Sequence, residues 1–195
     1  MAEKNILLLN GHEKFPPLAM GKFNKSMFDL AKQIIEKCDK FSLNTTIVEQ
    51  HYETEKEIEK LLMADFIIYQ YPIYWFNVPA ALKKYMDQVY THGYKKIYAG
   101  DSTSNKKYGQ QGLLKGKYML SVTFNASGSI FNPIDGFFAN KNTDDVLNSM
   151  HKTQQYLGLK KMPSFACYDI VSGTKQKEYL DQYKDHLNHI LTSEF

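Results

Sequence analysis

Five apolar runs of strand length alternate along this chain with segments of helical periodicity, and this alternation is the strongest constraint on its fold. Each run is separated from the next by a segment long enough to form a crossover helix. The pattern predicts an α/β fold with a doubly wound, five-stranded parallel sheet and helices on both faces. The expected strands are residues 6–9, 45–48, 65–71, 118–122 and 164–168, and the expected helices are residues 21–40, 53–63, 79–89, 145–157 and 175–191.

Composition and charge narrow the class of protein. With 195 residues, 43% of them hydrophobic, the chain suits a single domain spanning residues 1–195. No apolar run reaches the roughly 18 residues of a membrane helix, and no signal sequence precedes the first strand. Cys38 and Cys167 have no CxxC pairing and fit reduced core residues of a cytoplasmic protein. A net charge of +3 with dispersed lysines argues against nucleic-acid binding, and the pair His186 and His189 lacks a third metal ligand.

The first candidate site follows the first strand, where a loop leads into a predicted helix start at residues 21–26. No Gly-x-Gly-x-x-Gly follows this strand, so the dinucleotide-binding fingerprint of nicotinamide enzymes is absent. Free N–H groups and the helix dipole can hold a phosphate or pyrophosphate at such a helix start. An ordinary helix start is an equally open interpretation of Gly21 and Asn24. His12, in the preceding loop, either contacts a cofactor phosphate or lies at the surface.

A second candidate site follows the third strand, where two prolines, Pro72 and Pro79, bracket a run of bulky residues at 73–78. Exposed aromatic side chains in a loop are costly unless they pack on another group. A flat heteroaromatic ring or a subunit interface would each provide that group, and a cofactor site at a dimer interface would provide both.

A third candidate site lies at the end of the fourth strand. A basic loop punctuated by glycines, residues 106–116, runs into the strand, and small and amide-bearing side chains follow it at residues 123–126. Because ligands bind at the carboxyl ends of strands in open α/β sheets, this stretch predicts a planar cofactor with polar edges. Tyr108, in the loop, either donates a phenolic hydrogen bond to substrate or cofactor or is an ordinary turn tyrosine.

Several segments together carry a family resemblance. They are residues 6–11, 21–26, 70–75, 83–87, 106–109, 117–126, 151–158 and 183–187, and they span nearly the whole chain. On these segments the sequence resembles the flavodoxin-like NAD(P)H:quinone oxidoreductases, especially the bacterial modulator of drug activity B type. The resemblance implies a flavodoxin-like fold and a homodimer that binds FAD near its interface.

The resemblance also implies which residues form the site. Tyr108 is the expected catalytic residue and also contacts the cofactor. The expected pyrophosphate loop consists of Ala19, Met20, Gly21, Lys22, Phe23, Asn24, Lys25 and Ser26, and the expected flavin-ring contacts are Ile73, Tyr74, Trp75, Phe76, Thr123, Phe124, Asn125 and Ala126. Ala19 and Met20 stand where the family usually has Ser and Asn, which leaves FAD and FMN both open as the flavin.

The activity implied by the resemblance is two-electron reduction of quinones. NADPH or NADH would deliver hydride to the flavin and leave, and a quinone would then accept it in a ping-pong cycle, with NADPH as the expected donor. Two alternatives stay open: an FMN-dependent nitro or azo reductase of the same fold, and a non-enzymatic electron carrier of the flavodoxin kind. No stable membrane insertion is expected.

Overall fold

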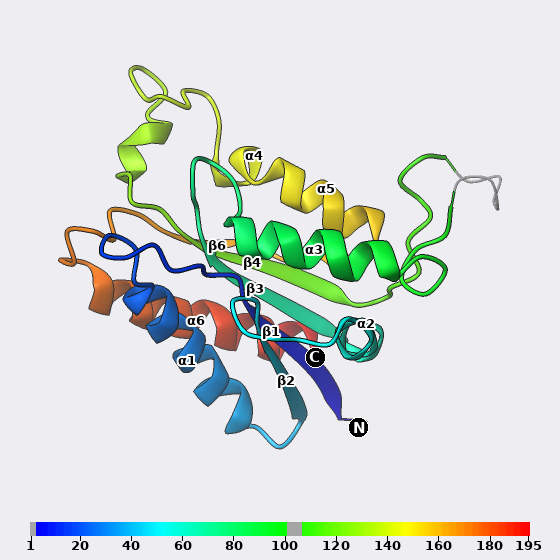
Figure 1. Cartoon of the computed structure of the whole chain (residues 1–195). Coiled ribbons are helices and arrows are strands. Elements are labelled where there is room, and N and C mark those ends of the chain that lie inside the picture. Colours follow the sequence, from blue (N-terminus) through cyan, green and yellow to red (C-terminus); the bar gives the residue numbers. More distant parts are fainter. Residues whose placement is uncertain (1–2, 101–106) are drawn as a thin grey trace.

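A computed structural model describes residues 3–100 and 107–195 (Figure 1). The strands form one parallel sheet in the order β2-β1-β3-β4-β5, and β6 also pairs with β4. The strands are β1 (Lys4–Asn10), β2 (Phe41–Ile47), β3 (Phe66–Pro72), β4 (Lys117–Thr123), β5 (Lys160–Lys161) and β6 (Phe165–Cys167). The helices are α1 (Lys22–Glu36), α2 (Thr54–Met63), α3 (Ala80–His92), α4 (Thr143–Val146), α5 (Asn148–Tyr156) and α6 (Gln176–Glu194), with a 3-10 turn, η2 (Gly128–Phe131), after β4. The predicted doubly wound α/β fold is confirmed.

Alternating strand residues supply two separate cores. On β1, Leu7 and Leu9 pack with side chains of α2, α3 and α5, whereas Ile6 and Leu8 pack with side chains of α1 and α6. This follows from the two-residue period of a strand, which sends successive side chains to opposite faces. Figure 1 shows α1 and α6 on one side of the sheet and α3 and α5 on the other. Both faces of β1 and β3 are fully covered, which is why their sequences read as continuous apolar runs.

Several element boundaries differ from the sequence prediction. The fifth sheet position is filled by two short strands, β5 and β6, with Pro163 between them, because a proline lacks the N–H needed to continue a ladder. The helix predicted over 145–157 begins earlier, at Thr143, with an Asn142–Asp145 capping box, and is divided at Leu147 into α4 and α5. The first helix ends at Glu36 rather than at residue 40, and β2 begins at Phe41.

The parallel strands end at one common edge of the sheet. The loops that follow β1, β3, β4 and β6 therefore gather there, at the left of Figure 1. The chain leaves β1 toward β2 on one side and reaches β3 on the other, so β1 and β3 flank the topological switch point where ligands bind in such sheets. Within the described residues, no helix has the length and apolar character to cross a membrane, and no cluster of three or more His, Cys, Asp or Glu residues could hold a metal.

Candidate functional site

The start of α1 is held open by a glycine and a histidine. Gly21 occupies the N-cap position with φ +68°, and no described side chain caps the helix. The first N–H groups of a helix have no acceptor inside it, so those of α1 point toward a free space at the carboxyl edge. The His12 ring lies directly over Gly21, because a Cβ added there would come within 2.4 Å of the imidazole. Only a glycine permits this contact and this backbone angle together.

His12 is a buried residue whose Nε2 has no hydrogen-bond partner among the described residues. Burial lowers the pKa of its imidazole, and the nearby Glu49 opposes that shift. A buried polar atom without a partner is uncommon and calls for a ligand or a water. His12 therefore adds a candidate anion contact to the helix start. Its burial shows that the alternative interpretation, a histidine at the surface, is wrong.

Three buried amides tie α1 to the sheet. Asn24 donates to the Asn10 Oδ1 over 2.8 Å, and the Gln70 Nε2 donates to the Asn24 Oδ1 over 3.0 Å. The backbone N–H of His12 donates to the same Asn10 oxygen over 3.1 Å. The Asn24 side chain is thus occupied in positioning the helix start between β1 and β3, which leaves its backbone N–H as the group available to a ligand.

A cavity of about 330 Å³ lies in front of this helix start. It extends past α1 to Ile170, Val171 and Gln176, which follow β6. Thr123, at the end of β4, also lines it, with an Oγ1 that has no partner among the described residues. The predicted site residues that line this cavity are Ala19, Met20, Gly21, Lys22, Phe23, Asn24, Tyr74, Thr123 and Asn125.

A larger cavity, of about 790 Å³, continues from the first. Leu18, Ala19, Tyr74 and Asn125 line both cavities, so the two form one crevice across the switch point. Asn125 stands at their junction, and predicted ring contacts Ile73, Tyr74 and Trp75 line the larger part.

The loop after β3 has an uncommon backbone. Trp75 and Phe76 both adopt positive φ, +49° and +61°. Tyr74 and Asn77 hold this turn by exchanging backbone hydrogen bonds of 2.9 and 3.0 Å. The Trp75 side chain is 95% exposed, so packing on other described residues does not explain the strained conformation. Strain of this kind, about 1–3 kcal/mol for each such residue, gathers at functional sites.

Some predicted contacts lie outside this crevice. Phe124 is a core residue stacked on Tyr168, and the Ala126 carbonyl accepts a hydrogen bond from the Asp169 N–H. Phe76 stacks on Phe137 at 5.5 Å, away from the cavity. Lys25 and Ser26 lie on the exposed surface of α1, where Lys25 pairs with Asp29 and the Ser26 hydroxyl donates to the Lys22 carbonyl.

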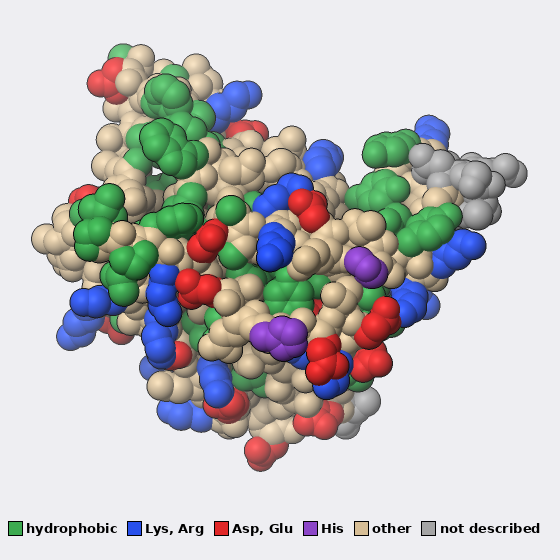
Figure 2. Space-filling view, in the orientation of Figure 1, with side chains coloured by type: hydrophobic (Ala, Val, Ile, Leu, Met, Phe, Trp, Pro, Cys, Tyr) green, Lys and Arg blue, Asp and Glu red, His purple; other side chains and the backbone are tan. Residues whose placement is uncertain are grey.

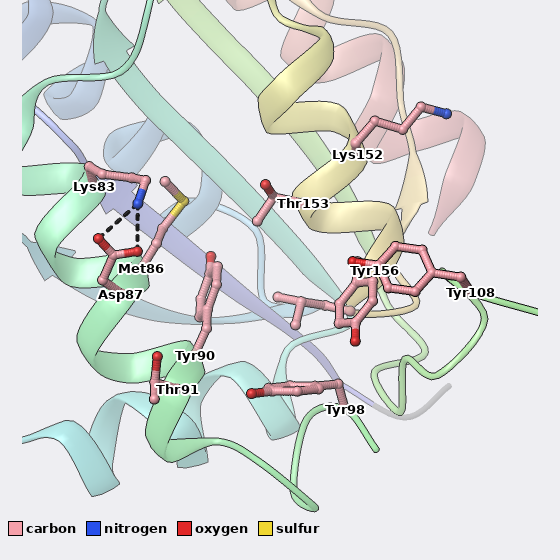
Figure 3. A pocket seen from close by; sticks show the side chains of 11 residues that line it. Lys83, Met86, Asp87, Tyr90, Thr91, Tyr98, Tyr108, Lys152, Thr153 and Tyr156 are labelled. Atoms are coloured by element: carbon pink, nitrogen blue, oxygen red, sulfur yellow. Dashed lines mark hydrogen bonds and ion pairs between the residues drawn. The ribbon is translucent and has the colours of Figure 1, made fainter. Parts of the chain in front are cut away.

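Tyr108 lies far from the crevice of its own chain. It lines a third cavity, of about 550 Å³, between α3 and α5, where its ring is 5.6 Å from Tyr156 (Figure 3). Figure 1 shows the loop before β4 at the end of the molecule opposite the crevice loops. Lys83, paired with Asp87 at 2.6 and 2.8 Å, lines both this cavity and the larger part of the crevice. Lys106, the first residue of the predicted basic loop, lies outside the described residues.

Comparison with known proteins identifies the family. A family model for the flavodoxin-like fold matches residues 4–191. The chain belongs to the flavodoxin-like fold family. Among the curated members, NADPH:quinone oxidoreductase MdaB of Haemophilus influenzae is 36% identical over 191 residues, which cover 95% of this chain and 98% of that protein. An uncharacterised protein of Schizosaccharomyces pombe is 39% identical over 193 residues, covering 96% and 97% of the two chains.

Solved structures show the same flavodoxin-like fold. A Klebsiella pneumoniae protein described as a candidate quinone reductase superposes with a TM-score of 0.77 at 21% identity, covering 98% of this chain and 85% of that one. A general stress protein 14 of Treponema denticola, in complex with FMN, superposes with a TM-score of 0.66 at 19% identity, covering 96% and 99%. At 21% and 19% identity, these superpositions show that the proteins share a fold with this chain and nothing about its activity.

Proposed function

We propose that this flavodoxin-like protein is an NAD(P)H:quinone oxidoreductase that uses FAD and prefers NADPH. The observation that carries the proposal is the single crevice at the switch point, which joins an open helix start to an aromatic-walled cavity. The 36% identity to an NADPH:quinone oxidoreductase over 95% of the chain supports the same activity. Two free cysteines, one of them buried, suit a reducing compartment such as the cytoplasm.

The described residues fit a flavin. The backbone N–H groups of Lys22, Phe23 and Asn24 and the unpartnered His12 Nε2 would hold its phosphate groups. The Asn125 amide, at the junction of the two cavities, would hydrogen-bond the edge of the ring. When bound, the flavin supplies the hydride chemistry, and the protein supplies binding and orientation.

The loop after β3 would stabilise negative charge next to the ring. The Tyr74 N–H is already donated to the Asn77 carbonyl, so the N–H groups of Trp75 and Phe76 are the donors that remain in this turn. Donors fixed before the reaction cost no reorganisation when charge develops. The strained φ angles of Trp75 and Phe76 are consistent with this role, because they orient both peptide groups.

FAD is favoured over FMN by the residues that line the smaller cavity away from the helix start. Beyond the helix start it continues along Ile170 and Val171, which offer an apolar surface for an adenine ring. The FMN alternative is supported by Ala19 and Met20, which provide no hydroxyl or amide to the phosphates, and by the FMN complex among the structural neighbours. Reconstitution of apoprotein with both flavins, followed by chromatography of the bound one, distinguishes them. Recovery of FMN alone would contradict the FAD assignment.

We also propose a homodimer in which Tyr108 acts in the partner's site. In its own chain Tyr108 is 81% exposed and lies opposite the crevice, but the groove between α3 and α5 shares the lining residue Lys83 with the crevice. A second copy seated on this groove would bring its own Tyr108 loop toward the crevice of the first copy. Light scattering that shows a flavin-loaded monomer of 22.6 kDa at micromolar concentration would contradict this arrangement.

The activity itself is tested by NADPH-dependent reduction of a quinone, measured at several fixed quinone concentrations. Parallel lines in double-reciprocal plots are expected for a ping-pong cycle. Nitroaromatic and azo compounds serve as the competing acceptors. A higher kcat/KM for these than for quinones would favour the alternative reductase, and oxidation of NADPH by none of the acceptors would favour an electron carrier.

A further inference from the structure

Apolar side chains at the carboxyl edge of the sheet are exposed to an unusual degree. Leu18 is 94% exposed and Trp75 is 95% exposed, and Phe15 beside them is 49% exposed. All three line the larger part of the crevice. Figure 2 shows hydrophobic side chains gathered over the loops at the left of the molecule. A contiguous apolar patch of this kind marks a binding surface.

The apolar wall formed by Phe15, Leu18 and Trp75 carries no net charge, unlike the proposed anion-binding inner end of the crevice. Among the described residues that line the larger cavity there is no carboxylate, and its one cation, Lys83, is neutralised by Asp87. Its polar side chains also include two amides, of which Asn77 accepts a hydrogen bond from the Val78 N–H and Asn125 faces the junction with the inner cavity. The cavity therefore has one amide-bearing end, at Asn125, and a long apolar wall leading outward from it.

The wall is also formed in advance of any ligand. Phe15 and Ala19 exchange backbone hydrogen bonds of 3.0 and 2.9 Å, which close the loop that carries Leu18 at its tip. The Phe15 ring packs edge-on against Tyr74 at 5.5 Å, so this loop is fixed to the one that carries Trp75. A surface that is already ordered loses little conformational entropy on binding, and its apolar area contributes more fully to affinity.

We propose that the acceptor is a quinone bearing an apolar, isoprenoid side chain, which lies on Phe15, Leu18 and Trp75 while the quinone ring stacks on the flavin ring that Asn125 holds. This inference rests on the proposed quinone reductase activity. The occupant is chosen by continuity, since the apolar wall and the amide-bearing end belong to one cavity of about 790 Å³. A polar ring with an apolar tail matches both ends of that cavity, whereas a small polar acceptor would leave the wall exposed to water.

Steady-state kinetics of the holoprotein test the role of the tail. The acceptors are dimethoxy-methyl-benzoquinones with no side chain, with one isoprenoid unit and with two. We expect kcat/KM, expressed for each protein as a ratio to its value with the tailless quinone, to rise with tail length, and Leu18→Ser to lower this ratio about three- to tenfold. Flavin content is measured for each variant. The matched controls are Ile134→Ser, at the same edge but outside the cavity, and Leu62→Ser on α2; both should keep the full gain.

The outcomes separate this inference from the activity on which it rests. Equal kcat/KM for tailed and tailless quinones, or an equal loss for both in Leu18→Ser, would overturn the tail assignment and leave the activity standing. Failure to reduce any quinone would overturn the proposed function itself.

A binding measurement covers that last case, because Trp75 is the only tryptophan of the chain. Geraniol, an alcohol with two isoprenoid units, should shift the Trp75 emission to the blue in the wild type and much less in Leu18→Ser. No shift with geraniol would overturn the proposal. A shift with neutral phosphatidylcholine vesicles but not with geraniol would also overturn it, and would assign the wall to a lipid surface instead.

Discussion

At its inner end, beside the start of α1, the crevice consists of buried polar groups that hydrogen-bond to one another; at its outer end it consists of exposed apolar side chains on loops. Asn10, Asn24 and Gln70 form the inner network, and Leu18 and Trp75 dominate the outer wall. The contrast follows from what each end must do. The inner end has to hold one anionic group in one position, whereas the outer end has to admit and release a ligand at every turnover.

The largest expected effect comes from adding one methyl group to the inner end. Gly21→Ala would place a Cβ 2.4 Å from the His12 ring at a φ of +68°, so either the His12 ring or the helix start must move. We expect apoprotein with flavin affinity reduced by at least about 100-fold, together with a stability loss of about 1–3 kcal/mol from the backbone strain. Flavin absorbance after gel filtration and a thermal melt measure the two effects.

Gly109→Ala is the matched control for this prediction. Gly109 also has a positive φ, +87°, but no described atom lies within 4 Å of an added Cβ. It should lose stability from strain alone and keep its flavin. If both variants retain flavin equally, the contact between His12 and Gly21 does not shape the binding site.

The next prediction is that substitutions of Tyr108 and Asn125 have different effects, one on turnover and the other on flavin binding. Tyr108→Ala should lower kcat/KM for quinones about 10- to 100-fold through lost positioning, with normal flavin content, because its ring is 81% exposed and contributes little to the fold. Asn125→Ala should instead lose flavin. Steady-state assays are read beside flavin content for both variants. Wild-type turnover in Tyr108→Ala, or equal flavin loss in the two, would remove Tyr108 from the site.

A smaller effect concerns pH at the inner end. Burial lowers the pKa of the His12 imidazole from its ordinary value of 6.5, so the native state resists a proton that the unfolded chain accepts. Wild-type apoprotein should therefore lose stability relative to His12→Gln as the pH falls below 6.5, and the difference should be constant above it. The charges of Glu13, Glu49 and Lys14 also influence the pKa of the His12 ring. The His12→Gln variant keeps all three charges, so they are the same in the two proteins.

Urea unfolding of both proteins across this pH range provides the measurement. His151 and His186 also have lowered pKa values and contribute equally to the two curves, so they cancel in the difference. Parallel curves at every pH would show that His12 titrates as it does in the unfolded chain, and would remove the case for a buried imidazole with an unpartnered Nε2.

The smallest effect is expected at the outer end of the crevice, where a substitution should stabilise the protein rather than destabilise it. Trp75→Gly should relieve the strain at φ +49° and raise the free energy of unfolding by about 0.5–1 kcal/mol, since the 95% exposed indole contributes little packing. Phe76→Gly relieves the same kind of strain but removes the contacts with Phe137 and Phe138, so it should destabilise the protein. Urea unfolding tests both, and destabilisation by Trp75→Gly would show that its ring packs on a neighbour.

Much of the fold could be predicted from the sequence, because β1, β3 and β4 are buried on both faces and therefore read as apolar runs. The boundaries of α1, β2 and α4 were less accessible, since they depend on caps and turns more than on periodicity. Asn142, three residues before Asp145, was a usable signal for the earlier start of α4. The division of the fifth strand at Pro163 is a second case of local chemistry changing a predicted element.

The candidate site was predictable by segment and less so by side chain. The loops after β1, β3 and β4 meet as expected, because parallel strands place their carboxyl ends together. Which side chains turn inward depends on the register of each loop: Asn125 faces the crevice, while its neighbour Phe124 belongs to the core. The position of the His12 ring over Gly21 and the distance of Tyr108 from its own crevice are tertiary facts without a local sequence signal.

The amides that join β1, α1 and β3 have a consequence for how the protein matures in a cell. Asn10, Asn24 and Gln70 hydrogen-bond to one another without any cofactor atom, although the Gln70 Oε1 has no partner among the described residues. We therefore expect the scaffold around the site to fold without a cofactor. We expect newly made chains to accumulate in the folded form even when vitamin supply is short, and to be activated later by uptake of the cofactor. Nutritional state would then set how much of the pool is active, and loading would add thermal stability in proportion to the logarithm of the free cofactor concentration.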